Sequence, residues 1–201
     1  PLDEGWPMPG CYAFDGLDAR LKHVLSIDPA ARILVRVDLH APEFWYATHP
    51  DDAVDYAMGR PNGRISGADL ATGERPLRIS LASAAWRAAT SDALAALVRH
   101  LQKTDVGRHV VGIMTAGCTQ GEWHYWGFFY LPDTGPAMTA HFRAAMRRLC
   151  RGDLPTLRRR WHMKLPTWQD VRPPALERLV EGPTTFRDGK NAAWTLDYVR
   201  C

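Results

Sequence analysis

The sequence predicts an α/β fold in which helices alternate with parallel strands. Two apolar segments rich in β-branched residues predict buried strands, at 33–39 (ILVRVDL) and 110–114 (VVGIM). Apolar residues at helical spacing precede each strand, at 17–25 and at 86–101. Because helix, strand, helix and strand follow one another, we expect a parallel sheet that is covered by helices.

The elements follow in order after a loop at 1–14 that is rich in proline and glycine. Asp15 and Ser83 are suitable caps for the two helices that precede the strands. A further helix is predicted to begin near Pro136, because proline is favoured in the first turn. Shorter helical patterns occupy 154–161 and 191–200. We otherwise expect the segment 151–201 to be an irregular insertion that leads into the next helix.

A long polar loop at 40–77 follows the first predicted strand. Loops of this length inside a compact domain are usually functional rather than connective. Trp45 could line a site within it, and His49 could contact a ligand. Packing of Trp45 onto the core is an equally good interpretation.

Glu122 is the catalytic candidate because the chain delivers this carboxylate into a dense aromatic segment. The second predicted strand runs into a small-residue turn at 115–121, and Trp123 and Trp126 follow the acid at once. Aromatic rings should exclude water from the carboxyl group and favour its protonated, proton-donating form. Rings with polar edges also suit sugars. The alternative is a surface acid beside core aromatic residues.

Asp38 ends the first predicted strand and should lie near Glu122. In parallel α/β folds the carboxyl ends of the strands face the binding crevice, and both acids lie at such ends. Because an aspartate is shorter than a glutamate, we interpret Asp38 as a structural or substrate-orienting residue.

Composition argues against nucleic acids as partners. The chain of 201 residues is 46% hydrophobic and 23% charged, as in ordinary globular proteins, and its formal net charge is only +3. Seven arginines between Arg143 and Arg160 surround a single acid, Asp153. On predicted helices such a cluster is usually a solvated face, or it pairs with acids elsewhere in the fold.

The cysteines and the apolar segments favour a cytoplasmic protein without membrane association. Cys11, Cys118, Cys150 and Cys201 form no close pair, which predicts neither a zinc knuckle nor a disulfide framework. No leader is recognisable, and no apolar run is long enough to span a bilayer. The start at Pro1, without Met, suggests an internal piece of a longer protein.

Four segments, in order, resemble the β-galactosidase-like glycoside hydrolases of the (β/α)8-barrel clan, nearest to glycoside hydrolase family 42. They are IDPAARILVRVDLHAPEFWYATHPDD (27–52), ISLASAAWRAATSDALAALVRHL (79–101), VVGIMTAGCTQGEWHYWG (110–127) and PAMTAHFRAAMRRL (136–149). The resemblance implies that residues 1–201 are part of one TIM-barrel domain. They would supply about the third and fourth strands with their helices, and place the loop 40–77 on the active-site side.

The same resemblance implies a retaining glycosidase that cleaves a terminal β-glycosidic bond, and we expect no cofactor. Glu122 maps onto the general acid/base at the end of the fourth barrel strand. The nucleophile, a glutamate near the end of the seventh strand, would lie outside this chain. The substrate-binding residues implied or predicted are Trp45, His49, Arg78, Asp38, Trp123 and Trp126. One departure is Gly121, because the clan usually has Asn immediately before the acid/base.

Two other hypotheses can be compared with this one. A carbohydrate-binding domain without catalysis would keep the aromatic crevice, and Gly121 is its best support. A metal site from Cys118, His124, Cys150 and His162 has suitable ligand types but no recognisable ligand spacing, so we predict no metal.

The partner that we expect is a carbohydrate substrate, and the resemblance is compatible with a homo-oligomer. A partial barrel leaves sheet edges and inner faces open, which favours self-association unless more chain or a partner covers them.

Overall fold

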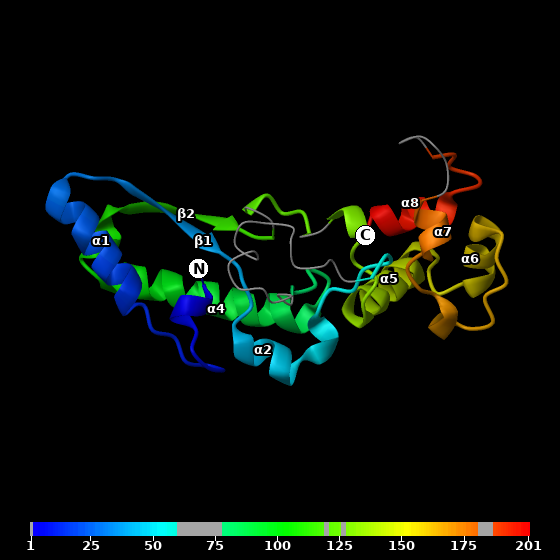
Figure 1. Ribbon diagram of the computed structural model, residues 1–201, viewed down its shortest axis with the longest axis horizontal. Coiled ribbons are helices and arrows are strands. Elements are labelled where there is room, and N and C mark those ends of the chain that lie inside the picture. Colours follow the sequence, from blue (N-terminus) through cyan, green and yellow to red (C-terminus); the bar gives the residue numbers. More distant parts are fainter. Residues whose placement is uncertain (1, 60–77, 119–120, 126–127, 181–186) are drawn as a thin grey trace. The chain divides into compact units, whose positions relative to one another are not determined.

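A computed structural model of the protein describes residues 2–59, 78–118, 121–125, 128–180 and 187–201 (Figure 1). The chain forms two compact units, and each is built from two separate stretches of sequence. The first comprises Pro1–Pro50 and Ala84–Trp126, and the second comprises Asp51–Ser83 and Gly127–Cys201.

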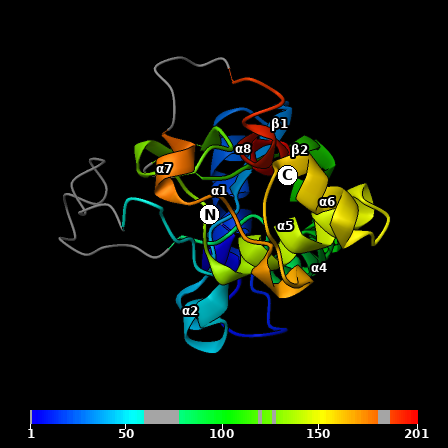
Figure 2. The same cartoon turned by 90° about the vertical axis from the view of Figure 1, so that its right-hand side faces the viewer.

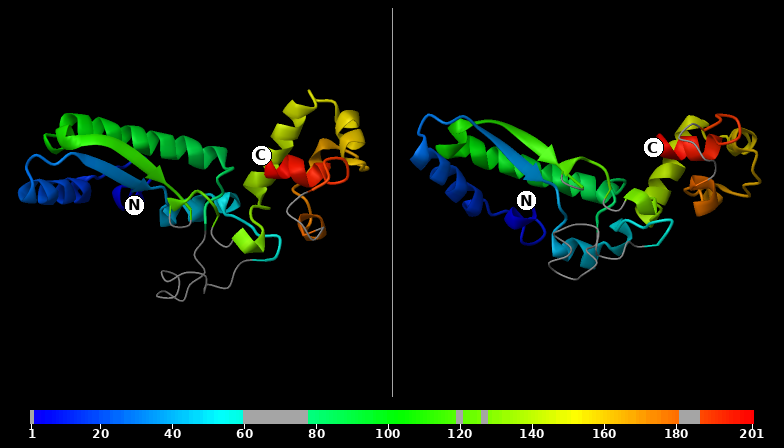
Figure 3. Two further views of the ribbon diagram at one scale, coloured as in Figure 1. Left: turned by 90° about the horizontal axis from the view of Figure 1, so that it is seen from above. Right: turned by 45° about the horizontal axis from the view of Figure 1, so that its top comes forward.

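The first unit contains a two-stranded parallel sheet formed by β1 (Ile33–Asp38) and β2 (Val110–Ala116). The helix α4 (Ala84–Lys103) precedes β2 and runs alongside the strands, and α1 (Asp15–Ile27) precedes β1 (Figure 3). The predicted alternation of helices with parallel strands is therefore confirmed. β2 extends two residues beyond the predicted strand, to Ala116.

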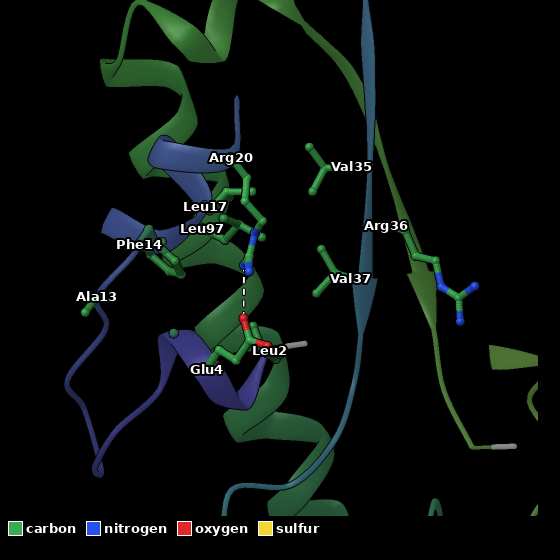
Figure 4. A pocket seen from close by; sticks show the side chains of 12 residues that line it. Leu2, Glu4, Ala13, Phe14, Leu17, Arg20, Val35, Arg36, Val37 and Leu97 are labelled. Atoms are coloured by element: carbon green, nitrogen blue, oxygen red, sulfur yellow. Dashed lines mark hydrogen bonds and ion pairs between the residues drawn. The ribbon is translucent and has the colours of Figure 1, made fainter. Parts of the chain in front are cut away.

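The two faces of this sheet differ because side chains alternate along a strand. Val35 and Val37 are buried toward the helices, while Arg36 points to the opposite side (Figure 4). A hollow of about 90 Å³ lies on the helix side of the strand. The opposite face carries Leu34, which is 59% exposed, and Met114, which pairs with Arg36 in the register and is 45% exposed.

Two local expectations differ from the structure. The polar segment after β1 contains a short helix, α2 (Glu43–Thr48), and only 60–77 of the predicted loop lies outside the described residues. Asp15 is the first residue of α1 rather than its cap, because Phe14 occupies the N-cap without a side-chain hydrogen bond.

The second unit is built around α5 (Pro136–Leu149), with Pro136 in the first turn as predicted (Figure 2). The predicted shorter helices are confirmed as α6 (Leu154–Trp161) and α8 (Ala193–Val199), and a third, α7 (Leu176–Leu179), lies in the part that we expected to be irregular. Its core includes Phe142, Met146, Leu157, Trp161, Val171 and Tyr198. Burial of these apolar side chains therefore orders a segment whose local pattern is weak.

Short 3-10 turns complete both units. They are Asp3–Gly5, Pro50–Asp52, Val106–His109, Phe128–Tyr130 and Trp168–Asp170.

Buried carboxylates hold segments of the second unit together through hydrogen bonds. Asp197 is 3% exposed and accepts two hydrogen bonds of 2.6 Å from Arg160. It also accepts one from the Trp161 indole N–H at 2.8 Å. A buried carboxylate is stable only with such partners, and here one arginine of the basic cluster supplies two of the three bonds.

Asp133 is a second buried carboxylate, and it links segments of the second unit that are distant in the sequence. Its side chain, in a residue that is 1% exposed, accepts hydrogen bonds from the Ser80 hydroxyl and the Gly135 N–H. Its backbone carbonyl accepts one from the Tyr198 hydroxyl at 2.8 Å. These bonds join residues that are up to 65 positions apart in the sequence.

None of the helices described here is both long and apolar enough to cross a membrane. Cys11, Cys118, Cys150 and Cys201 are free thiols.

We predict that Tyr198 weakens the fold at alkaline pH. Burial, and secondarily the charge of Asp133, raise the pKa of Tyr198 from 10.0 to about 12. A raised folded-state pKa means that the neutral phenol contributes full stability below pH 10. Between pH 10 and 12 that contribution, about 2–3 kcal/mol, should be lost.

Urea unfolding between pH 8 and pH 12 tests this expectation, with Tyr198→Phe beside the wild type. The variant should lose about 1 kcal/mol at pH 8 through its missing hydrogen bond. As the pH rises from 10 to 12 the difference between the two proteins should shrink and then reverse, because the wild type loses more stability than the hydrogen bond contributed. A difference that stays constant over this range would contradict the assignment.

Candidate active site

A tight turn presents Glu122 just beyond the carboxyl end of β2. Cys118, Gly121 and Trp123 all have left-handed backbone conformations, with φ between 61° and 82°. The Trp123 N–H donates to the Gly117 carbonyl at 3.1 Å, which closes the turn. The Trp123 ring lies directly over Gly117, where an added Cβ would come within 3.1 Å of it. Glycine at position 117 therefore leaves the room that the Trp123 ring occupies.

The immediate partner of Glu122 is a histidine. His124 Nε2 lies 3.0 Å from Glu122 Oε2. The side chain of Glu122 is 63% exposed and that of His124 is 40% exposed. The expectation that aromatic rings enclose this carboxylate is wrong for the residues that the structure describes, because Trp123 covers Gly117 instead and is itself 47% exposed. Trp126, the other predicted ring, lies outside the described residues.

Asp38 is held by Arg36 on the same face of β1. The guanidinium places Nη2 at 2.8 Å and Nε at 3.2 Å from Asp38 Oδ1. Both side chains keep contact with solvent, with 47% of Arg36 and 26% of Asp38 exposed. Such a partly exposed pair contributes little to stability but fixes the direction of the carboxylate.

Arg36 also explains why glycine precedes Glu122. A Cβ added at Gly121 would lie 2.5 Å from Arg36 Nη2 and 2.9 Å from Ala116 Cβ. The φ of Gly121 is +82°, which side-chain-bearing residues rarely adopt. The guanidinium thus occupies the space that the side chain of an asparagine would need. One arginine connects Asp38, at the end of β1, to the residue next to Glu122.

The other predicted contacts are distributed more widely. Trp45 is 6% exposed and belongs to the core of the first unit, where its ring packs near Trp6 and Trp86. His49 stacks on Trp45 with ring centroids 4.1 Å apart. The packing interpretation of Trp45 is therefore the one that its burial favours, since neighbouring rings cover it.

Arg78 lies in the second unit, where its carbonyl accepts a hydrogen bond from the Val54 N–H at 2.8 Å. Among the described residues, no three His, Cys, Asp or Glu side chains gather closely enough to hold a metal ion.

Sequence reasoning did not identify Arg36 and considered His124 only as a metal ligand. A usable signal exists for Arg36, because it is the one charged side chain inside the apolar run ILVRV. Its position alternates with Val35 and Val37, so the period of the strand places it on the face opposite the helices. No comparable signal marks His124, whose contact with Glu122 depends on the conformation of the turn.

The fold of the chain is that of a segment of the β-galactosidases. The sequence itself matches no family model and no curated protein. Comparison with solved structures gives matches over nearly the whole chain, at identities that support a shared fold alone. The resemblance inferred from the sequence motifs is confirmed at that level.

Three of these structures are representative. The β-galactosidase from Bacillus circulans sp. alkalophilus has a TM-score of 0.64 and 17% identity over 99% of this chain and 26% of its own. The polyextremophilic β-galactosidase from Halorubrum lacusprofundi gives 0.61 and 15%, over 98% and 26%. A catalytic mutant of Gan42B, a GH42 β-galactosidase from G. stearothermophilus, gives 0.58 and 15%, over 98% and 25%. The chain therefore spans about a quarter of their length.

Replacement of Gly121 by alanine should destabilise the first unit. The left-handed conformation alone costs about 1–2 kcal/mol for a residue with a Cβ, and the contacts with Arg36 and Ala116 add to it. Gly10→Ala is the matched control, because Gly10 has φ +71° in the same unit and no heavy atom within 4 Å of an added Cβ.

Urea unfolding of both variants separates the cost of the left-handed backbone, which they share, from the cost of the contacts with Arg36 and Ala116, which only Gly121→Ala makes. Gly121→Ala should cost more than Gly10→Ala, and adding Arg36→Ala should recover part of the difference. Equal costs for the two glycine variants would refute the packing of Arg36 against Gly121.

Proposed function

We propose that this chain is the acid/base-bearing part of a retaining, β-galactosidase-like glycoside hydrolase. Glu122 is its general acid/base, and the nucleophile lies outside the chain. In this proposal β1 and β2 are about the third and fourth strands of a (β/α)8 barrel. The substrate is a carbohydrate with a terminal β-glycosidic bond.

One observation carries the proposal. Glu122 follows β2, which pairs in parallel with β1, so it lies beyond the same edge of the sheet as Asp38. The guanidinium of Arg36, which binds Asp38, lies next to Gly121. Binding sites of parallel α/β folds form at the carboxyl ends of the strands. The fold likeness to β-galactosidases over 98–99% of the chain adds support by analogy.

The proposed chemistry needs two carboxyl groups. Glu122 donates its proton to the oxygen of the leaving group while the nucleophile, about 5–5.5 Å away, bonds to the anomeric carbon. The C–O bond to the leaving group breaks, and a covalent glycosyl-enzyme forms. Glu122, now a carboxylate, then takes a proton from the water that releases the sugar. His124 is its hydrogen-bonding partner in the free protein.

Arg36 is the proposed replacement for the missing asparagine. The clan uses an amide at this place to hold a sugar hydroxyl, and a guanidinium is likewise a hydrogen-bond donor. Its position against Gly121 puts this donor beside the acid/base, and Asp38 fixes its orientation. Arg36 and Asp38 are therefore proposed as substrate-positioning residues. His49, Arg78, Trp123 and Trp126 keep their predicted roles as sugar contacts.

A carbohydrate-binding domain without catalysis is the second candidate. The exposure of the Glu122 side chain favours it, because catalytic carboxyl groups usually lie in sites from which water is excluded. The two candidates differ in whether turnover depends on Glu122.

We predict that Glu122→Gln in the intact protein lowers kcat/KM for nitrophenyl glycosides at least about 100-fold, since general acid–base catalysis contributes about 10²- to 10⁴-fold. Glu43→Gln is the matched control, because it removes the same charge from an exposed glutamate in the first unit. It should leave turnover unchanged.

The assay uses a panel of β-linked nitrophenyl sugars with the wild type and both variants. Circular dichroism confirms that each variant is folded. Wild-type protein that binds sugar but hydrolyses none of the panel would instead support the non-catalytic candidate.

A further inference from the structure

The second unit contains an open pocket of about 570 Å³ that shares no residue with Glu122 or its partners. Three segments of the chain line it. They are 55–57, the start of α5 with Thr134, Pro136 and Thr139, and 172–176. A volume of this size accommodates a small molecule, since ligand sites usually measure about 300–1,000 Å³.

Two arginines give this pocket a positive character. Arg143 from α5 and Arg172 both line it, and Asp55 is the one acidic side chain among the described residues of the lining. Guanidinium groups suit phosphate and carboxylate because their planar array of N–H donors matches two oxygens of such a group.

Arg143 has one donor that is buried and unsatisfied. Its Nη2 donates to the Gln169 carbonyl at 3.0 Å, which anchors the side chain. Its Nε is inaccessible to solvent and has no hydrogen-bond partner within the described part of the chain. Since water cannot reach Nε, an anion in the open pocket would bond the terminal Nη groups of Arg143 rather than Nε.

The start of α5 also favours a negatively charged ligand in this pocket. This helix of 14 residues begins at the pocket with Gly135 as its N-cap, which has no side chain to accept from the first turn. The amino-terminal end of a helix favours negative charge, because its first N–H groups lack partners within the helix. Thr134 and Thr139 line the pocket as well, and threonine hydroxyls are suitable partners for an uncharged polar part of the ligand.

We propose that this pocket binds the oxyanion group, phosphate or carboxylate, of a small molecule through Arg143 and Arg172. The proposal does not depend on the assignment of Glu122, because the two sites have no residue in common. Its consequence is that the intact protein binds an anionic ligand at a site that shares no residue with that of Glu122.

Calorimetric titration of the intact protein at constant ionic strength tests the site. The probes are inorganic phosphate, glucose 6-phosphate and glucuronate, with uncharged glucose as the reference. Arg143→Gln and Arg172→Gln should each weaken binding of the anions about tenfold or more, as expected when a charge-assisted hydrogen bond is lost. Arg148→Gln is the matched control, because it lies on α5 outside the lining and carries the same charge change.

The relative affinities of the three anionic probes identify the kind of ligand that the pocket binds. Equal affinity for inorganic phosphate and glucose 6-phosphate means that the phosphate group alone is recognised, and tighter binding of the sugar phosphate means that the remaining pocket contributes. Preference for glucuronate identifies a carboxylate ligand. The proposal is overturned if the wild type binds no anion saturably, or if Arg172→Gln binds as the wild type does. Arg172 is exposed, so its variant remains informative if Arg143→Gln fails to fold.

Discussion

The parallel pairing of β1 with β2 is the constraint on which the candidate site depends. Parallel strands end at the same edge of a sheet, so the residues after Val37 and those after Thr115 emerge together. Asp38 belongs to the first end, and the turn that carries Glu122 follows the second. Without this register the two acids would be unrelated points on the surface.

Arg36 fixes the positions of the groups at this edge of the sheet. It holds Asp38 with two hydrogen bonds and fills the space next to Gly121. Glycine at position 121 is therefore matched to the arginine on β1, because an added side chain would meet its guanidinium. This packing is our reason for proposing a working site beside Glu122.

Much of the fold was predictable because local pattern and tertiary packing agree. The stripe from Trp86 to Leu101 is long enough to specify α4, and β-branched residues specify β1 and β2. The short helix α2 was not predictable. It consists of six residues, and burial of Trp45 against distant rings orders it. The same long-range contacts place Trp45 in the core, which no local pattern could distinguish from a ligand contact.

The candidate site was predictable in its position but not in its environment. The order of strand, turn and acid located Glu122, yet the density of aromatic residues gave the wrong surroundings. A left-handed backbone at Trp123 turns that ring onto Gly117 and leaves the carboxylate to His124. In the basic cluster, the pairing of Arg160 with the buried Asp197 confirms the predicted alternative of an acid elsewhere in the fold, whereas the position of Arg143 in a pocket wall was not predicted. Such differences between neighbouring arginines arise from tertiary contacts.

Chemical rescue by azide tests the role of Glu122 most directly. In a retaining glycosidase that lacks its acid/base, azide attacks the glycosyl-enzyme from the face on which water would have reacted. The intact Glu122→Ala protein, given a dinitrophenyl β-glycoside, should therefore be accelerated by azide and should release the β-glycosyl azide, identified by NMR. An α-glycosyl azide would identify Glu122 as the nucleophile instead, and activity that azide does not change would contradict its assignment as the acid/base.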